Sequence, residues 1–288
     1  MKGACSACLL LIVTAAMPVY ADSTQCTIQP GMPANPITQS HQTLPSDGNP
    51  ELTVQSRSGN IQIATWDRKE IQLDVLKEAP TKERADAVKL VVAPSGSGIS
   101  IHPEFPLNHG WFGITTLDES YVHGPQAVKV HLVLTVPSGT RLNAAYTTCG
   151  NIDLTGLSGK ILAHPEIGAI AAKKLTGSAR LTTENGRITA EFAAVSGTVV
   201  LRSSNGAVEA WLPADLNGSM LLTAFHGNLT NDFGGTIITK PGGARVIRTT
   251  VGSGGAEVFI TAVLGPLTVH RVGPQKVAPP ARKPTAHH

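Results

Sequence analysis

The sequence predicts an all-β protein, a single-stranded β-solenoid (β-helix) with two strands per coil of about 18–21 residues. The first observation is that glycines recur every 9 to 12 residues. The series is Gly150, Gly159, Gly168, Gly177, Gly186, Gly197, Gly206, Gly218 and Gly227. The second is that positions two and four after these glycines are apolar, except Asn231. Such alternation is typical of strands with one buried face, and a strand and corner repeated at a fixed interval indicate a solenoid.

The third observation is that the corners alternate between two kinds. An apolar residue followed by Ser, Thr or Asn precedes one set of glycines, as in Leu157-Ser158-Gly159. Asn185 and Asn205 precede glycines of the other set, and Asn-Gly is a turn dipeptide because both residues tolerate positive φ. A series of hairpins also uses Asn-Gly, but it gives no reason for two alternating corners. The pattern therefore favours a solenoid over a sandwich.

Residues 1–21 have the features of a secretory signal peptide, with Lys2, an apolar run over 9–16 and a small-residue cleavage site at 19–21. A membrane anchor would need a longer apolar run, and a lipoprotein would need a different pattern around its cysteine. We therefore expect an exported protein located in the periplasm, cell envelope or extracellular space. We expect no transmembrane segment in the mature chain.

The rest of the chain divides into three parts. We expect residues 22–50 to be a proline-rich extended leader, 51–272 the solenoid domain and 273–288 a disordered tail rich in Pro, Lys, Arg and His. Thr81 to Ala87 can form helical turns with Thr81 as the cap. Residues 102–126 interrupt the pattern as an aromatic insertion. Strands are expected at 52–55, 61–63, 71–75, 90–93, 99–101, 128–136, 237–238, 246, 258–260 and 267–269.

Two cysteines, Cys26 and Cys149, remain after removal of the signal peptide. Two cysteines in an exported chain are consistent with a disulfide. Cys149 stands at a corner position where other coils have Asn185 and Asn205, so its side chain is expected to be accessible. Two unpaired thiols are the alternative, and the sequence leaves both open.

Several short phrases follow one another in a characteristic order. The first two are Ser58-Gly59-Asn60-Ile61, with Trp66 and Val75 beyond it, and Val136-Pro137-Ser138-Gly139. Three corner phrases follow, namely Cys149-Gly150-Asn151-Ile152, Asn185-Gly186-Arg187-Ile188 and Asn205-Gly206-Ala207-Val208. In these residues the chain resembles the bacterial putative-adhesin domains, a β-solenoid family of unknown function. The likeness covers about residues 50–270 and implies an exported or envelope-associated protein without an established activity. The insertion 102–126 and the irregular stretch 232–253 depart from the pattern.

Enzymatic chemistry finds little support in the sequence. Solenoids that cleave polysaccharides need carboxylates close together on one outward face. The expected outward column holds Asp153 and Glu209 three coils, roughly 14 Å, apart, which is too far for a paired mechanism. His102, His109 and His123 lie in the insertion, where they could form a metal or sugar site or simply pack a loop. We expect no catalytic residues, no metal and no cofactor.

The second outward column contains Leu162, Arg180, Val200 and Leu221. A soluble protein seldom leaves such an apolar stripe uncovered, so it is expected to contact something. The candidates within the chain are the leader and the insertion, whose large apolar side chains are Trp111, Phe112 and Tyr121. If neither covers the stripe, these residues together become the candidate partner surface.

Three function classes follow from the sequence. The favoured one is a non-enzymatic, adhesin-like surface or scaffold protein with an unknown protein or glycan partner. The alternatives are a solenoid that binds or cleaves polysaccharide and a partner or sensor domain of an envelope stress system. A net charge of +3 is too small to indicate nucleic acid as a partner.

Overall fold

The structure is a computed structural model of the 288-residue chain. It describes Cys26 and residues 37–46, 48–95, 98–109 and 115–273. The predicted signal peptide 1–21, most of the predicted leader and the tail 274–288 lie outside the described residues, as do Trp111 and Phe112.

The all-β class is confirmed. The described strands form one curled 19-stranded sheet and one two-stranded sheet. The predicted helical turns are present as α1 (Lys82–Ala87), and Thr81 caps them by accepting a hydrogen bond from the backbone N–H of Arg84. The insertion contributes a two-stranded sheet, formed by β7 (Leu107–His109) and β8 (Thr115–Leu117), and a 3-10 turn, η3 (Glu119–Tyr121).

The strands of the first half of the chain are β1 (Thr38–Pro45), β2 (Glu51–Ser58), β3 (Ile61–Trp66), β4 (Glu70–Glu78), β5 (Lys89–Ser95), β6 (Gly98–Glu104), β7 (Leu107–His109), β8 (Thr115–Leu117) and β9 (Lys129–Pro137). Those of the second half are β10 (Arg141–Cys149), β11 (Ile152–Thr155), β12 (Ser158–Ile167), β13 (Ile170–Asn185), β14 (Ile188–Asn205), β15 (Val208–Pro213), β16 (Gly218–His226), β17 (Leu229–Asn231), β18 (Ile238–Thr239), β19 (Arg245–Val251), β20 (Ala256–Leu264) and β21 (Leu267–Val272).

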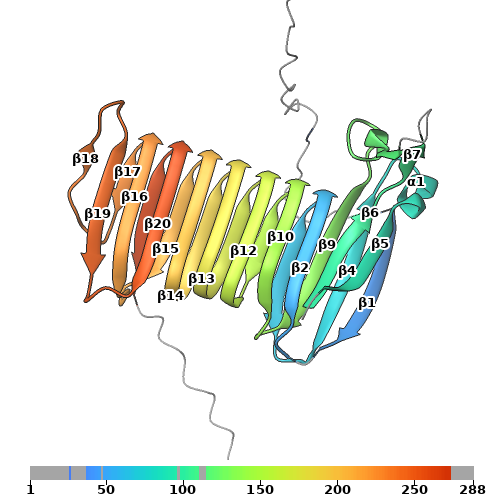
Figure 1. The fold of residues 1–288 in the computed structure, drawn as a ribbon, viewed down its shortest axis with the longest axis horizontal. Coiled ribbons are helices and arrows are strands. Elements are labelled where there is room, and N and C mark those ends of the chain that lie inside the picture. The colour runs from blue at the N-terminus through green and yellow to red at the C-terminus, as the bar shows by residue number, and fades with distance from the viewer. Residues whose placement is uncertain (1–25, 27–36, 47, 96–97, 110–114, 274–288) are drawn as a thin grey trace, which may run out of the picture.

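The pairings arrange these strands in two ladders, which Figure 1 shows as a long stack. Ladder A runs β1, β4, β9, β3, β11, β13, β14, β15, β21 and β17. Ladder B runs β5, β6, β2, β10, β12, β13, β14, β20, β16, β19 and β18. The long strands β13 and β14 belong to both, the first half of each to ladder A and the second half to ladder B. Pairing is parallel in the middle of the stack and antiparallel at its ends.

The register explains the sequence period. Ile152 pairs with Ile170 and Ile170 with Ile188, so equivalent residues are 18 positions apart. All three side chains are buried, and together with the alternating apolar residues of ladder B they form one hydrophobic core. Apolar burial of this kind is the main favourable contribution to folding. The inward positions predicted from the glycine spacing are confirmed.

Glycines form a column at one corner because the backbones of successive turns approach each other closely there. A Cβ atom on Gly186 would lie 1.9 Å from the carbonyl oxygen of Gly168, and one on Gly168 would lie 1.8 Å from that of Gly150. Next to this column, Oδ1 of Asn60 accepts a hydrogen bond from the backbone N–H of Asn151. The corner sequence therefore reflects both close packing and hydrogen bonding between coils.

The order of the last coils differs from the sequence prediction. We expected the coils to stack in chain order, which placed Glu209 next to Thr230 and Val200 next to Leu221. In the structure β20 lies between β14 and β16, and β21 lies between β15 and β17. The chain first forms β16 and β17 near the end of the stack. After the antiparallel strand β19 it returns, and β20 and β21 occupy the two positions left between these strands and β14 and β15. The prediction of sequential stacking was therefore wrong for these coils.

The start of the folded sheet also differs from the predicted boundary at residue 51. Strand β1, in the stretch assigned to the leader, pairs antiparallel with β4 over its whole length. Its side chains are mostly exposed, and His41 Nδ1 lies 2.8 Å from Asp74 Oδ1. This segment carries no apolar alternation because β1 contributes little to the core.

Candidate functional site

An apolar row runs across the outer face of ladder B. The register places Leu162, Arg180, Val200, Phe259 and Leu221 side by side on β12, β13, β14, β20 and β16. The three aliphatic side chains are half-buried, and Phe259 is 37% exposed. The structure therefore aligns the stripe predicted from the sequence and adds Phe259, which the expected chain order had missed. We call these five residues the ladder-B stripe.

A shallow groove of about 430 Å³ lies over one end of the stripe. Its lining includes Leu162, Arg180 and Val200 from the stripe, together with Lys160. Hydroxyl groups border these side chains, contributed by Ser178, Ser196 and Thr198. No carboxylate is among the described residues that line the groove, so its surface combines aliphatic, hydroxyl and cationic groups.

The expected cover of the stripe is not seen in the described part of the insertion. Tyr121 packs against the hydrophobic core, and the guanidinium of Arg84 lies 3.8 Å from the centre of its ring. Figure 1 shows α1 and β7 at the end of the stack near β1, whereas β16 and β20 lie toward the opposite end. Tyr121 therefore does not join Leu162, Val200 and Leu221 in one surface.

A second, more polar cleft of about 290 Å³ lies over β2 and β10. Its lining includes Arg57, His102 and Tyr146. The Tyr146 ring stacks on His164 with 5.8 Å between centroids, and its hydroxyl donates a hydrogen bond to Glu166. Burial, followed by this bond, raises the pKa of Tyr146, so the phenol stays protonated at neutral pH. Aromatic, cationic and anionic groups thus meet in a small space.

Cys26 and Cys149 form a disulfide with 5.8 Å between their Cα atoms. The bond attaches the segment before β1 to the end of β10. A cavity of about 210 Å³ adjoins it, and its lining includes Ser58, His123 and Lys129. A disulfide has no thiol group to titrate, so neither cysteine can serve as a nucleophile or metal ligand while the bond is intact.

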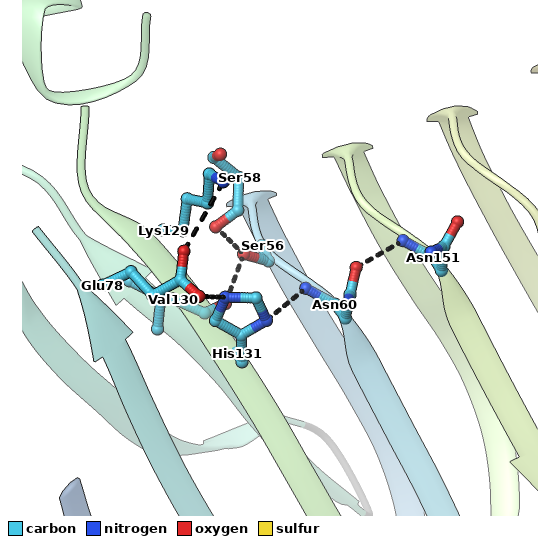
Figure 2. A network of polar contacts seen from close by, with 8 residues as sticks. All are labelled: Ser56, Ser58, Asn60, Glu78, Lys129, Val130, His131 and Asn151. Carbon is cyan, nitrogen blue, oxygen red and sulfur yellow. Dashed lines mark hydrogen bonds and ion pairs between the residues drawn. The ribbon is translucent and has the colours of Figure 1, made fainter. Parts of the chain in front are cut away.

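A buried polar network lies beside this cavity (Figure 2). His131 is almost fully buried on β9, and its Nδ1 atom accepts a hydrogen bond of 3.2 Å from the backbone N–H of Asn60. Glu78 lies between His131 and Lys129, with its Oε2 atom 3.5 Å from the Lys129 ammonium. Ser56 donates to the carbonyl oxygens of Ser58 and Val130. The sequence offered no signal for this network, because His131 stands at a position that alternates with the inward Val130 and Leu132, where a polar residue is ordinary.

The carboxylates considered for catalysis do not meet. Asp153, Ala171, Thr189 and Glu209 occupy neighbouring strands in that order, so Asp153 and Glu209 are three strand spacings apart, as the sequence predicted. Burial raises the pKa of Asp153, and Lys173 opposes this effect. Neither carboxylate has another acidic side chain as its neighbour in this row.

Glu209 instead interacts with His270, which the predicted order of the strands did not place beside it. His270 Nε2 lies 3.2 Å from Glu209, and its Nδ1 lies 3.6 Å from Asp232. The His270 ring stacks on Trp211 with 5.1 Å between centroids. The return of β21 beside β15 creates this cluster, and sequential stacking of coils could not have predicted it.

Metal binding finds no support in the described part of the chain, where no three His, Cys, Asp or Glu side chains are placed to hold an ion. This applies to His102, His109 and His123, the histidines that the sequence brought together in the insertion. His102 lines the Tyr146 cleft, whereas His123 lines the cavity beside the disulfide. The described helix is also too short and too polar to cross a membrane.

No protein-family model matches this chain, and neither does any curated protein. Similar solved structures include a putative cell adhesion protein from Clostridium sporogenes, with 10% identity and a TM-score of 0.43 over 83% of this chain and 100% of the other. A putative adhesin from Bacteroides fragilis has 12% identity and a TM-score of 0.32 over 81% and 97%. One from Parabacteroides distasonis has 13% identity and a TM-score of 0.32 over 82% and 97%. These likenesses are too distant to assign the chain to a family or a function.

Proposed function

We propose that this chain is an exported, non-enzymatic, adhesin-like protein that uses the ladder-B stripe to bind a partner. The observation that carries the proposal is the row of Leu162, Val200, Phe259 and Leu221, which the register aligns across neighbouring strands and leaves partly exposed. Contiguous apolar surface on a secreted protein is typical of an interaction site. Export is inferred from the predicted signal peptide, residues 1–21.

The proposed scaffold is a β-solenoid. The support is that β13 and β14 each run from ladder A into ladder B, so that each of these two segments supplies a strand to both ladders. Both ladders also contribute to one core. Such a scaffold is held by hydrogen bonds between neighbouring coils, and its faces change little when an outward side chain is replaced.

The absence of catalysis is part of the proposal. Cleavage of a glycosidic bond by the common mechanism needs two carboxylates about 5–10 Å apart across the sugar. Asp153 and Glu209, separated by β13 and β14, do not meet this requirement. The pKa of Asp153 is raised by burial, which is a feature of some catalytic acids, but it lacks a partner carboxylate in its row.

A direct test measures binding and product release separately. The chain without residues 1–21 is applied to an array of purified neutral and acidic glycans and to phospholipid vesicles, and the solution is analysed for cleaved product. We expect binding without product. Leu221→Lys should weaken binding at least tenfold with an unchanged melting temperature, because it places a charge in the half-buried stripe. Thr189→Lys on the outer face of ladder A is the matched control and should bind normally.

Two results would contradict the proposal. One is release of product from any ligand. The other is unchanged binding of every ligand by Leu221→Lys, which would place the partner surface elsewhere on the molecule.

A polysaccharide-cleaving enzyme is the second candidate, and one cluster favours it. His270 contacts both Glu209 and Asp232 beside the Trp211 ring, which could stack on a sugar. If the array shows cleavage, Glu209→Gln should abolish it while Leu221→Lys leaves it intact. Cleavage that survives Glu209→Gln would exclude this cluster as the site.

A further inference from the structure

We infer that the outer face of ladder B binds an acidic polysaccharide, whose carboxylates lie on Lys160 and Arg180 in the groove and on Arg202 beside it. This inference rests on the proposed function, since it identifies the partner of the ladder-B stripe. It depends on three features of the same face: unpaired cations, an apolar row and carboxylates that limit the width of the ligand.

The cations stand on three consecutive strands. Lys160 is on β12, Arg180 on β13 and Arg202 on β14, and all three side chains are exposed. The register pairs Arg180 with Leu162 on β12 and with Val200 on β14. Lys160 precedes Leu162 by two residues, and Arg202 follows Val200 by two residues. The three charges therefore follow a diagonal across neighbouring strands, with strands spaced by about 4.8 Å.

Within the described residues, none of these three cations has an ion-pair or hydrogen-bond partner. Elsewhere on the molecule, several cations are engaged, as Arg84 is with Ser120 and Lys129 with Glu78. A row of unpaired cations attracts anions. Guanidinium groups favour carboxylates, which they can bind through two parallel hydrogen bonds.

The apolar row supplies the second half of the recognition. Leu162 and Val200 flank Arg180 on the two neighbouring strands, and the exposed Phe259 ring extends the row on β20. Sugar rings present C–H groups on one face and hydroxyls at their edges. The aliphatic and aromatic side chains can cover the C–H face, and the hydroxyls of Ser178 and Thr198 in the groove can bond to the edges.

Two carboxylates argue for a narrow polymer rather than a membrane. Glu166 and Glu184 lie farther along β12 and β13 on the same outer face, where they accept hydrogen bonds from Tyr146 and Ser204. An anionic bilayer covering the whole face would place its negative charge against these carboxylates. A single acidic chain can run along the diagonal of the three cations and avoid these two carboxylates as well as the exposed Glu257, which lies beside Thr198, so charge complementarity favours the polysaccharide.

The test uses polygalacturonate as the acidic probe and its fully methyl-esterified form as the matched neutral probe. Titration calorimetry should detect binding of polygalacturonate that weakens as salt is added, and at least about tenfold weaker binding of the ester. Arg180→Gln and Arg202→Gln should each weaken binding about tenfold, as loss of a charge-assisted hydrogen bond does. Arg187→Gln, an equal change of charge at a corner outside the groove, should leave the affinity unchanged.

Failure of this inference can be separated from failure of the proposed function. The inference is overturned if polygalacturonate does not bind, or if Arg180→Gln and Arg187→Gln bind it equally. If a neutral glycan then binds in a manner that Leu221→Lys abolishes, the proposed partner surface stands and only the ligand class is wrong. If no ligand depends on Leu221 and no binding of polygalacturonate depends on Arg180, both proposals fail.

Discussion

The Nε2 atom of the buried His131 lies 3.8 Å from Oε1 of Glu78, a separation too long for a hydrogen bond. The other ring nitrogen, Nδ1, already accepts from Asn60. Burial lowers the pKa of His131, Glu78 opposes this effect and Lys129 adds to it (Figure 2). The ring is therefore held in its neutral form inside the fold.

This network predicts a loss of stability in mild acid. A histidine whose pKa is lowered by folding binds its proton more readily in the unfolded chain, so the free energy of unfolding falls as the pH drops below about 6.5. His131→Asn keeps an acceptor for Asn60 but cannot be protonated in this range. Its free energy of unfolding, measured by urea titration between pH 8 and pH 5, should fall less than that of the wild type. The exposed His123→Asn is the control and should follow the wild type; parallel curves for all three proteins would contradict the prediction.

The corner column predicts that its glycines tolerate a methyl group far less well than a glycine in an open turn of the insertion. In Gly186→Ala the new Cβ atom would lie 1.9 Å from the Gly168 carbonyl oxygen, so neighbouring coils must separate. We expect a loss of about 3 kcal/mol or more. Gly124→Ala has φ of +77° but open space around the new atom, and the strain should be about 1 kcal/mol. Urea denaturation of both variants checks this, and equal losses would show that packing between coils does not determine the corner sequence.

Much of the local structure could be predicted from the sequence because the signal is local. Apolar residues two and four positions after each glycine marked the inward face, and Ile170 and Ile188 are buried as expected. Thr81 marked the start of α1. The stripe was also foreseen in part, since Leu162 and Val200 follow the outward positions of the same period.

The global order could not be predicted, because parallel coils of equal length can stack in any order that satisfies the core. Gly265 and Gly206 are followed by apolar residues at the same two positions, but nothing in either sequence indicates that the two corners are neighbours. For this reason Phe259 and the contact between His270 and Glu209 were missed. The buried network around His131 was missed because a single polar residue does not alter the strand period.

The disulfide predicts a clear difference between oxidised and reduced protein. Cys26 and Cys149 are 123 positions apart, and closing a loop of this size restricts the unfolded chain. In the chain without residues 1–21, Cys26→Ser should lower the free energy of unfolding by about 3 kcal/mol. Reductant should produce the same loss in the wild type and have no effect on Cys26→Ser. If the reductant has no effect on the wild type and no free thiol is detected, the bond is shielded from the reductant. If free thiols are detected and the reduced protein is as stable as the oxidised protein, the prediction is refuted.

The insertion of β20 between β14 and β16 gives the last prediction. Val258 is fully buried, with Val199 and Met220 as its neighbours in the two adjoining strands, whereas Phe259 points outward. Val258→Lys places an unpaired charge in the core and should lower the free energy of unfolding by several kcal/mol. Phe259→Lys should change it by less than about 1 kcal/mol, since its side chain remains at the surface. Urea denaturation distinguishes the two. If β20 were instead an end strand added after β16, Val258 would have one neighbouring strand and its replacement would be tolerated almost as well as that of Phe259.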